Sequence, residues 1–355
     1  MLTHLREQYD VAIVVRQPWA RWFRLLRRAL AKMSRGSVEI YWSPFWAGLA
    51  SRGARRAISL GSVDLVFCVG ISPICALLSG TVKTVFISDA TVAGLINYNP
   101  KFSALSSTYR TLANAVETKA VSQSIAAFYP SSWARDDAIR YHRACPDRAY
   151  LVNWGANLSA AHERTRPQYA GEQLRLLFVG VNWVSKGGSI AVEAVRILAA
   201  KGMRVRLDII GSRPENPEFV DPSVTLHGFL DKNNTVDRDR IVQMYSTSHL
   251  LLFPTQFEAL GIVSAEAASF GIPTIAFRTG GVAGNLVDGE TGILLDPGSS
   301  PQVWADTIFE LMSDSMRYTA MCDAAESWSR NRGNWATWAR FVARLLDGKE
   351  CEQEA

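Results

Sequence analysis

The stretch Leu250–Asp296, LLLFPTQFEALGIVSAEAASFGIPTIAFRTGGVAGNLVDGETGILLD, decides the fold. It opens with an apolar run that is typical of a strand and continues through a short polar loop into a helical pattern. Gly271 and Pro273 end that pattern. Two more apolar runs follow, Pro273–Phe277 and Gly292–Leu295. Strands that alternate with helices predict a parallel sheet, so the stretch indicates the α/β class.

The same alternation extends over the whole chain. In the first half we expect strands over Tyr9–Val15, Val38–Trp42, Asp64–Val69, Lys83–Ser88, Ala126–Tyr129 and Ala149–Val152. In the second half we expect Leu174–Gly180, Arg204–Gly211, Val224–Phe229, Leu250–Phe253, Pro273–Phe277 and Gly292–Leu295. These runs are almost continuously apolar, which is typical of strands covered on both faces.

A polar break without apolar periodicity divides the chain, and we expect four parts. They are an N-terminal domain over 1–157, a linker over 158–173, a C-terminal domain over 174–330, and a last helix and tail over 331–355. The helix of the last part is expected over Trp335–Asp347, where the apolar residues recur at helical spacing.

Composition narrows the class of protein. With 355 residues, 48% of them hydrophobic, the chain has enough apolar material for two cores. Its longest apolar stretch, Leu65–Leu78, is interrupted by Pro73 and is too short to span a bilayer, and Met1–Asp10 is too polar for a secretory signal. The five cysteines are odd in number and contain no C-x-x-C pair. We therefore expect a cytoplasmic protein without a disulfide framework or a zinc site.

Charge is distributed unevenly. Residues 1–160 contain 19 Lys and Arg against 9 Asp and Glu, whereas the remainder contains 19 against 24. Much of the excess lies in Arg16–Arg35, RQPWARWFRLLRRALAKMSR, which has seven basic residues and no acidic one. A basic helix anchored by Trp19 and Trp22 suits the interface of an anionic membrane, while an ordinary amphipathic helix that covers a sheet is the alternative. No nucleic-acid-binding motif is present, so nucleic acid is not an expected partner.

Two loops carry the residues that indicate chemistry. In the first, Glu258 and Gly261 precede a helix whose N-terminal N–H groups suit a phosphate. Glu266 lies eight residues after Glu258, among alanines, and a carboxylate on such a closely packed face needs a partner. It would suit the vicinal hydroxyls of a ribose. The alternative is that Glu258 caps the helix and Glu266 pairs on its surface.

The second loop lies in Leu174–Leu198, LRLLFVGVNWVSKGGSIAVEAVRIL. A strand ends at Gly180, and Lys186 is followed by two glycines at the start of a helix. A lysine at a helix N-terminus suits a diphosphate, although the spacing is not that of a P-loop. Both loops follow strands, so they are expected at the same edge of the sheet.

These motifs resemble glycosyltransferase family 4, a retaining group with the GT-B fold. The resemblance is carried by the E-x7-E pair in FEALGIVSAEA, with FVGVNWVSKGG, VTLHGFLD, GIPTIAFRTGG and GETGILLD as context, and by ISDAT, SSWARDDAIRYH and GANL in the first half. It implies two doubly wound Rossmann-like domains that face each other across a cleft, with a C-terminal helix that crosses back to the first domain.

The resemblance also implies roles for single residues. Lys186 would bind the donor diphosphate, Glu266 the ribose and Glu258 the donor sugar. The remaining positions that it places around the donor are Gly180, Leu260, Gly261, Ile262, Phe229 and Leu230.

Three features depart from the family pattern. Val181 stands where many members have an arginine, so either Lys186 carries more of the diphosphate charge or Arg278 contributes. Asp89 stands nearest to the place of a histidine, where a carboxylate would orient an acceptor hydroxyl or the donor sugar; the alternative is that Asp89 caps a helix. The first strand and its glycine-rich loop are not found, so we expect an N-terminally short member.

The expected function is transfer of a sugar from a nucleoside-diphosphate sugar to an acceptor hydroxyl, with Asp89, Glu258 and Lys186 as catalytic candidates. No cofactor or metal is expected, although Asp237 and Asp239 form a D-x-D sequence of the kind that metal-dependent sugar transferases use. The acceptor would be a glycan or a lipid-linked sugar at the inner face of the membrane, in cell-surface polysaccharide or glycolipid assembly. A nucleotide-sugar epimerase and a non-catalytic nucleotide-sugar-binding subunit are the alternatives.

Overall fold

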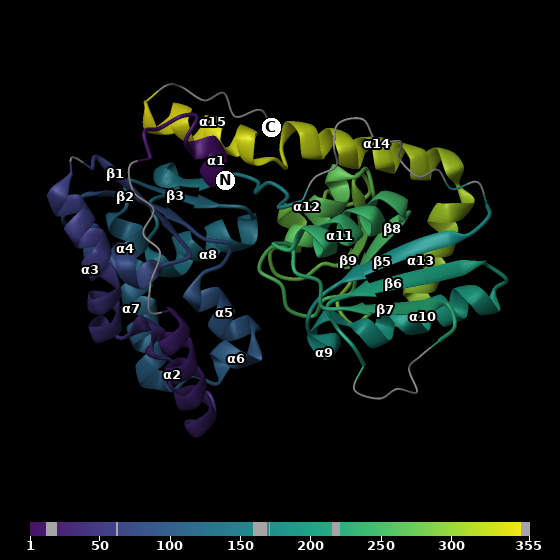
Figure 1. Cartoon of the computed structure of the whole chain (residues 1–355), viewed down its shortest axis with the longest axis horizontal. Coiled ribbons are helices and arrows are strands. Elements are labelled where there is room, and N and C mark those ends of the chain that lie inside the picture. The colour runs from purple at the N-terminus through teal and green to yellow at the C-terminus, as the bar shows by residue number, and fades with distance from the viewer. Residues whose placement is uncertain (12–19, 62, 159–168, 170, 215–220, 349–355) are drawn as a thin grey trace. The chain divides into compact units, whose positions relative to one another are not determined.

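The computed structural model of the chain describes residues 1–11, 20–61, 63–158, 169, 171–214 and 221–348 (Figure 1). The chain divides into two compact units. One consists of Met1–Val152 together with Ala339–Ala355, and the other of Asn153–Trp338. Among the described residues, no helix has both the length and the apolar character needed to cross a bilayer.

The second unit is built on a parallel sheet of six strands. In chain order they are β5 (Leu174–Val179), β6 (Val205–Ile210), β7 (Val224–Gly228), β8 (Leu250–Phe253), β9 (Thr274–Phe277) and β10 (Gly292–Leu295). Each lies within the range expected from the sequence. Their order across the sheet is β10-β9-β8-β5-β6-β7, the doubly wound arrangement in which the chain first builds outward from β5 and then returns to its other side.

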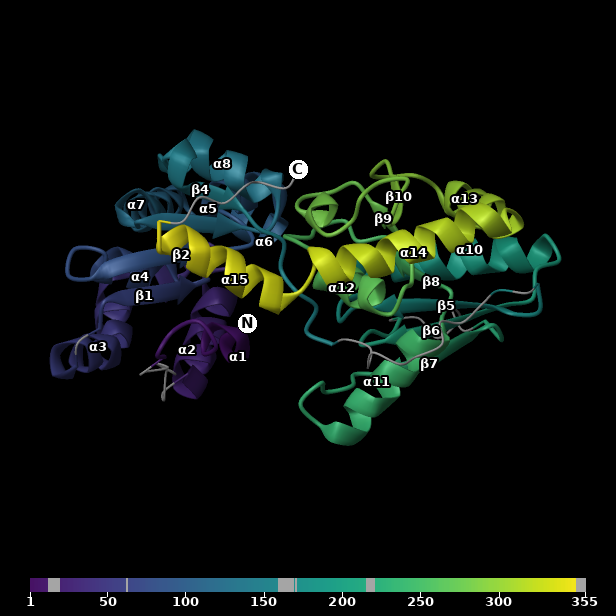
Figure 2. The same cartoon turned by 90° about the horizontal axis from the view of Figure 1, so that it is seen from above.

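Helices cover both faces of this sheet. They are α9 (Trp183–Lys186), α10 (Gly188–Ala200), α11 (Thr235–Thr247), α12 (Ile262–Ser269), α13 (Pro301–Ser313), α14 (Ser315–Asn331) and the short 3₁₀ helix η4 (Val282–Gly284). Alternate side chains of β5 point to opposite faces. Leu176 and Phe178 join a cluster with residues of α10 and α13, whereas Leu177 joins a second cluster with residues of α11 and α12. Figure 2 shows α10 and α13 on one side of the strands and α11 on the other.

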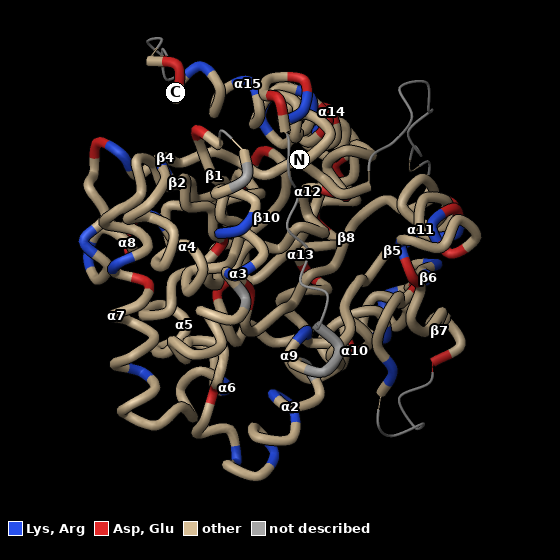
Figure 3. The backbone as a smooth tube through the Cα atoms, turned by 60° about the vertical axis from the view of Figure 1, so that its left-hand side comes forward, with Lys and Arg blue, Asp and Glu red and all other residues tan. Residues whose placement is uncertain are grey.

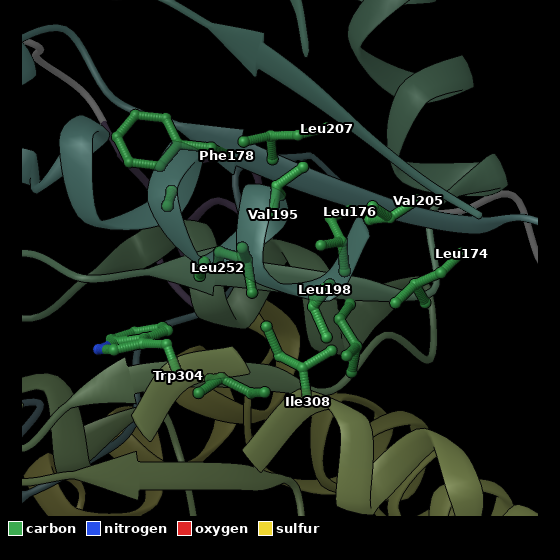
Figure 4. Close-up of a cluster of buried hydrophobic side chains, with 14 of the residues drawn as sticks. Leu174, Leu176, Phe178, Val195, Leu198, Val205, Leu207, Leu252, Trp304 and Ile308 are labelled. Carbon is green, nitrogen blue, oxygen red and sulfur yellow. The ribbon is translucent and has the colours of Figure 1, made fainter. Parts of the chain in front are cut away.

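The larger of these clusters is the core of the second unit (Figure 4). Leu176, Leu207 and Leu252 come from three adjacent strands, and Trp304 and Ile308 come from α13. Trp304 is fully buried and meets Phe277 edge to face with ring centroids 5.1 Å apart. This packing fixes the strand that ends before each loop of the site.

The first unit contains a smaller parallel sheet in the order β1-β2-β3-β4. Its strands are β1 (Leu65–Val69), β2 (Lys83–Ile87), β3 (Ala126–Tyr129) and β4 (Ala149–Leu151), all within the expected ranges. Its helices are α1 (Leu2–Leu5), α2 (Ala20–Met33), α3 (Pro44–Leu60), α4 (Ser72–Leu78), α5 (Val92–Tyr98), α6 (Pro100–Ser103), α7 (Ser107–Gln123) and α8 (Ser132–His142), with the 3₁₀ helices η1 (Ile40–Trp42) and η2 (Pro146–Arg148). The last helix, α15 (Trp335–Leu346), begins in the second unit and groups with the first from Ala339 on.

One expected strand is not found, and another lies mostly outside the described residues. The segment Val38–Trp42 forms η1, because the Glu39 carboxylate accepts a hydrogen bond from the Tyr41 N–H and tightens the chain into a turn. Glu39 is also held by Arg27 of α2, so a side-chain contact outweighs the β-preference of this apolar run. Of the expected strand Tyr9–Val15, residues 9–11 are not in a strand and residues 12–15 lie outside the described residues.

We expect Trp304→Ala to lower the free energy of unfolding by about 3–5 kcal/mol, because it leaves a cavity in a fully packed core. Val303→Ala at the adjacent, 42% exposed position is the matched control and should change stability by less than about 0.5 kcal/mol. Urea unfolding followed by tryptophan fluorescence measures both. Equal losses in the two variants would contradict the assignment of the core.

Candidate functional site

The site candidates of the second unit gather where the strand order reverses. β5 and β8 are neighbours in the sheet, but the connections that leave them lead in opposite directions. The loops at their carboxyl ends are therefore not covered by a crossover helix, and ligands of doubly wound sheets bind at such a point. The loop after β5 leads to Lys186, and the loop after β8 leads to Glu258.

These two loops meet in an ion pair. The Lys186 ammonium lies 2.5 Å from a carboxylate oxygen of Glu258, and both side chains are only partly exposed. The same ammonium lies 5.6 Å from the centre of the Phe253 ring, within the range of a cation–π contact. Lys186 and Glu258 are separate candidates for donor binding in the sequence, and the structure places them in direct contact.

Two glycines allow the loop after β5 and the loop after β8 to come into contact. Gly187 precedes α10 with a φ of +73°, and a Cβ there would lie 2.2 Å from the backbone oxygen of Pro254. Gly261 precedes α12 with a φ of +78°, and a Cβ there would lie 2.7 Å from the Phe253 ring. Neither glycine has a side chain to cap its helix. The first N–H groups of α10 and α12 are thus left to backbone, water or an anion.

Glu266 has a different environment from Glu258. It lies on α12, its side chain is 0% exposed, and it is not a surface carboxylate as the alternative supposed. Lys232 reaches it with distances of 2.6 and 2.7 Å to the two carboxylate oxygens, and the Tyr245 hydroxyl donates to one of them at 3.2 Å. Burial raises the pKa of Glu266, and the Lys232 ammonium acts against that rise.

Lys232 was missed by the sequence analysis. It lies in the loop between β7 and α11, in the run Asp231-Lys232-Asn233-Asn234, which reads as an ordinary polar turn. The buried Glu266 signalled that some partner must exist, but no local spacing indicated which of the cations of the second unit it is.

The remaining donor-site candidates differ in what they can offer a ligand. Leu230 and Leu260 are buried, and Leu230 packs with Tyr245 in the core, so these two can contribute only backbone. Phe229 is 71% exposed and leaves its ring available for stacking. At Gly180 a Cβ would lie 2.9 Å from Cγ of Lys186, so glycine there keeps the lysine in place. Ile262 is the first residue of α12 and is partly exposed.

Asp89 belongs to the first unit and follows β2 directly. It does not cap α5, contrary to the alternative interpretation, since the Thr91 hydroxyl is the cap and accepts a hydrogen bond from the Gly94 N–H at 3.1 Å. Thr91 also donates to the Asp137 carboxylate of α8. These hydrogen bonds of Thr91 fix the start of α5, just after Asp89.

A buried network also holds the start of α5. Glu117 of α7 accepts hydrogen bonds from the Val92 N–H at 3.1 Å and from the Ser72 hydroxyl at 3.4 Å. His142 of α8 accepts from the Ala93 N–H at 3.3 Å. Burial raises the pKa of Glu117 to about 8 and lowers the pKa of His142 to about 4. Both groups are therefore neutral at pH 7 while they hold the start of α5.

Two further positions have structural partners. Asp237, the first residue of the D-x-D sequence, lies in the first turn of α11 and accepts a hydrogen bond from the Asp231 N–H at 3.0 Å. Arg278, a second candidate for the diphosphate, pairs with the exposed Asp288. Within the described part of the chain, no three His, Cys, Asp or Glu residues are grouped closely enough to hold a metal ion.

Part of the second unit is similar to known proteins. Residues 173–314 match the model of the family described as Glycosyl transferases group 1. The D-inositol 3-phosphate glycosyltransferase of Xylanimonas cellulosilytica is 28% identical over 230 residues, which are 60% of this chain and 53% of that protein. That of Corynebacterium efficiens is 28% identical over 227 residues, or 59% of this chain and 53% of the relative. The chain thus spans about half the length of the curated relatives it matches.

Solved structures agree on the fold. Sucrose-phosphate synthase from Thermosynechococcus elongatus superposes with a TM-score of 0.65 at 18% identity, over 83% of this chain and 76% of that one. HepE of Anabaena in complex with UDP and glucose superposes with a TM-score of 0.62 at 17% identity, over 85% and 82% of the two chains. The expected GT-B fold of two α/β domains with parallel sheets is therefore confirmed, as is the resemblance to group 1 glycosyltransferases.

We expect the stability of the Glu117→Gln variant relative to the wild type to rise by about 1–4 kcal/mol between pH 5 and pH 8. Glu117 has a pKa of about 8 in the folded chain against 4.5 ordinarily, so the native state keeps a proton that the unfolded state releases. The wild type therefore loses stability as the pH rises through this window, and a glutamine removes the loss.

Urea unfolding at the two pH values measures this difference. Glu193→Gln on α10, where the carboxylate is exposed and pairs with Arg196, is the matched control and should show no such rise. A Glu117→Gln variant that parallels the wild type at both pH values would mean that Glu117 is ionised in the folded chain.

Proposed function

Because residues 173–314 match the family model of the glycosyl transferases of group 1, we propose that this chain transfers a sugar from a nucleoside-diphosphate sugar to an acceptor hydroxyl. The transfer would retain the anomeric configuration and need no metal, with the leaving diphosphate stabilised by the protein. The observation that carries the proposal is the Lys186–Glu258 ion pair at the carboxyl ends of β5 and β8.

The Lys186–Glu258 ion pair is suited to stabilise a diphosphate leaving group. Negative charge builds on the leaving oxygen as the sugar–oxygen bond breaks, and a fixed cation beside that oxygen stabilises it. Lys186 is held by Glu258 beside the start of α12, so its ammonium and the first helix N–H groups can act on the same phosphates. Val181 is exposed and uncharged, which supports assigning this role to Lys186.

The other residues would hold the rest of the donor. Glu258 would bind the sugar hydroxyls while it orients Lys186, and Glu266 would accept hydrogen bonds from the ribose. The exposed ring of Phe229 offers a stacking surface for the base. Asp89 would orient the acceptor hydroxyl or the donor sugar from the first unit, just before the helix start that Thr91 and Glu117 hold.

The acceptor is proposed to be a lipid-linked sugar or glycolipid at the membrane face, in cell-surface polysaccharide or glycolipid assembly. α2 contains basic residues and no acidic one (Figure 3). Its side chains Leu25, Leu26 and Met33 are exposed, together with the basic Arg28 and Lys32. Exposed leucines beside cations suit an anionic bilayer surface. Trp19 and the side chain of Trp22, the anchors expected from the sequence, lie outside the described residues.

We expect one nucleoside diphosphate to raise the melting temperature of the wild type, in a panel of UDP, GDP, ADP, TDP and CMP. A ligand at a hundred times its dissociation constant adds about 2.7 kcal/mol of stability. Lys186→Ala should lose the shift, because its loss removes the cation that binds the diphosphate. Lys201→Ala, which removes a surface pair with Asp306, is the matched control and should keep it.

The outcomes of this panel separate the candidate functions. A shift that is equal in all three proteins would remove Lys186 from the donor site, and the absence of any shift would contradict a nucleotide-sugar enzyme. Release of an epimer of the donor sugar without an acceptor would favour the epimerase. Binding without turnover in the presence of a cell extract would favour the non-catalytic subunit.

We expect the wild type to float with vesicles of phosphatidylglycerol and phosphatidylcholine at low salt, and to float less with phosphatidylcholine alone. The Leu25→Ser/Leu26→Ser variant should float severalfold less, because it removes the exposed apolar side chains of α2. Val303→Ser/Phe309→Ser on α13 removes two apolar side chains of similar exposure and is the matched control. Equal flotation of both variants would contradict a membrane role for α2.

A further inference from the structure

The pair formed by Lys232 and Glu266 is asymmetric in its burial. The Glu266 side chain is 0% exposed, whereas that of Lys232 is 35% exposed. The lysine thus lies between solvent and a carboxylate that solvent does not reach. A buried carboxylate stays charged only if it is paired and hydrogen-bonded, and Lys232 provides the pairing.

Among the described residues, Lys232 is the one cation that pairs with Glu266. Lys232 comes from the loop after β7 and Tyr245 from α11, and these are the ionisable groups that act on the carboxylate. On α14, which packs against α12, the contacting residues Ala325 and Trp328 are uncharged. The residues of β8 and β9 are uncharged as well. The charge state of Glu266 therefore depends on one ammonium group.

The hydrogen bonds leave limited room for a ligand. An ionised carboxylate has about four acceptor positions. Lys232 occupies one on each oxygen, and Tyr245 occupies a second on Oε2. One position therefore remains, on Oε1. A pair of adjacent hydroxyls needs two acceptor positions. The second position becomes free when the Lys232 ammonium moves from contact with both carboxylate oxygens to contact with one. The partly exposed side chain of Lys232 permits that shift.

We propose that Lys232 is a positioning residue of the donor site, whose ammonium holds the Glu266 carboxylate charged and oriented so that it accepts hydrogen bonds from the vicinal hydroxyls of the donor ribose. This inference rests on the proposed function, in which Glu266 faces the ribose. The inference adds Lys232 to the proposed donor site, a residue outside the E-x7-E motif. Lys232 acts through Glu266 and need not touch the donor.

A role through charge makes a specific prediction about pH. Without the ammonium, only the Tyr245 hydrogen bond opposes the effect of burial, and the pKa of the carboxyl group rises further. In Lys232→Met a larger fraction of the group is then protonated at a given pH, and the protonated group accepts fewer hydrogen bonds and binds the ribose less tightly. The ratio of variant to wild-type affinity should therefore fall as the pH falls, by up to about tenfold for each pH unit below the new pKa.

The experiment is calorimetric titration from pH 6 to pH 8.5 with UDP and with 2′-deoxy-UDP, or with the corresponding pair of whichever base the nucleotide panel selects. The proteins are wild type, Lys232→Met, Lys232→Arg and Glu266→Gln. Lys201→Met is the matched control, since Lys201 is also 35% exposed and also paired with a carboxylate.

We expect Lys232→Met to bind UDP more weakly toward low pH and to discriminate less between UDP and its 2′-deoxy form. Lys232→Arg should restore both properties, and Lys201→Met should match the wild type. Glu266→Gln should bind weakly at every pH. A Lys232→Met variant whose affinity and pH profile equal those of the wild type overturns the inference, and so does an equal loss for both nucleotides, which would place the lysine on the phosphates.

The double variant Lys232→Met/Glu266→Gln covers the case in which Lys232→Met fails to fold, because it leaves no unpaired buried charge. If Lys232 acts through Glu266, the double variant binds UDP as weakly as Glu266→Gln and no more weakly. A further loss in the double variant overturns the inference. Failure of the wild type to bind any nucleotide would instead refute the proposed function, and this inference with it.

Discussion

The second unit depends on one constraint, that a parallel sheet must be covered on both faces. Its central strands are almost continuously apolar, and crossover connections between parallel neighbours place helices on the two faces. Leu176 packs toward α10 and α13 while Leu177, the next residue, packs toward α11 and α12. Because the crossovers leave β5 in one direction and β8 in the other, the loops at these two strand ends remain uncovered and available for chemistry.

The carboxylates of Glu258 and Glu266, eight residues apart, have different environments near the carboxyl ends of the strands. Glu258 precedes α12, stays partly exposed and holds the Lys186 ammonium at 2.5 Å. Glu266 lies inside the unit and is reached by solvent-facing Lys232 and by the Tyr245 hydroxyl. The first arrangement keeps a cation where a leaving diphosphate would need it. The second keeps a negative charge where an apolar surrounding would otherwise neutralise it.

In the first unit, buried groups hold the start of α5, just after the catalytic candidate Asp89. Thr91 caps α5, and Glu117 and His142 hold its first N–H groups from α7 and α8. Both of these groups are neutral at pH 7, since burial shifts the pKa of each toward the uncharged form. The start of α5, just after Asp89, is therefore held by hydrogen bonds that uncharged side chains make.

The sequence by itself determined the alternation of strands and helices, the doubly wound class, and the loops that would carry Lys186, Glu258 and Glu266, because these follow from local apolar runs and glycine positions. It was wrong at Val38–Trp42, where contact with the distant Arg27 and the local Glu39 cap favoured a 3₁₀ turn over a strand. Only the tertiary structure decided that Lys186 meets Glu258 and that Lys232 is the partner of Glu266. Those pairs join residues 72 and 34 positions apart, and the distance between two side chains so far apart in sequence is set by how the strands order themselves in the sheet.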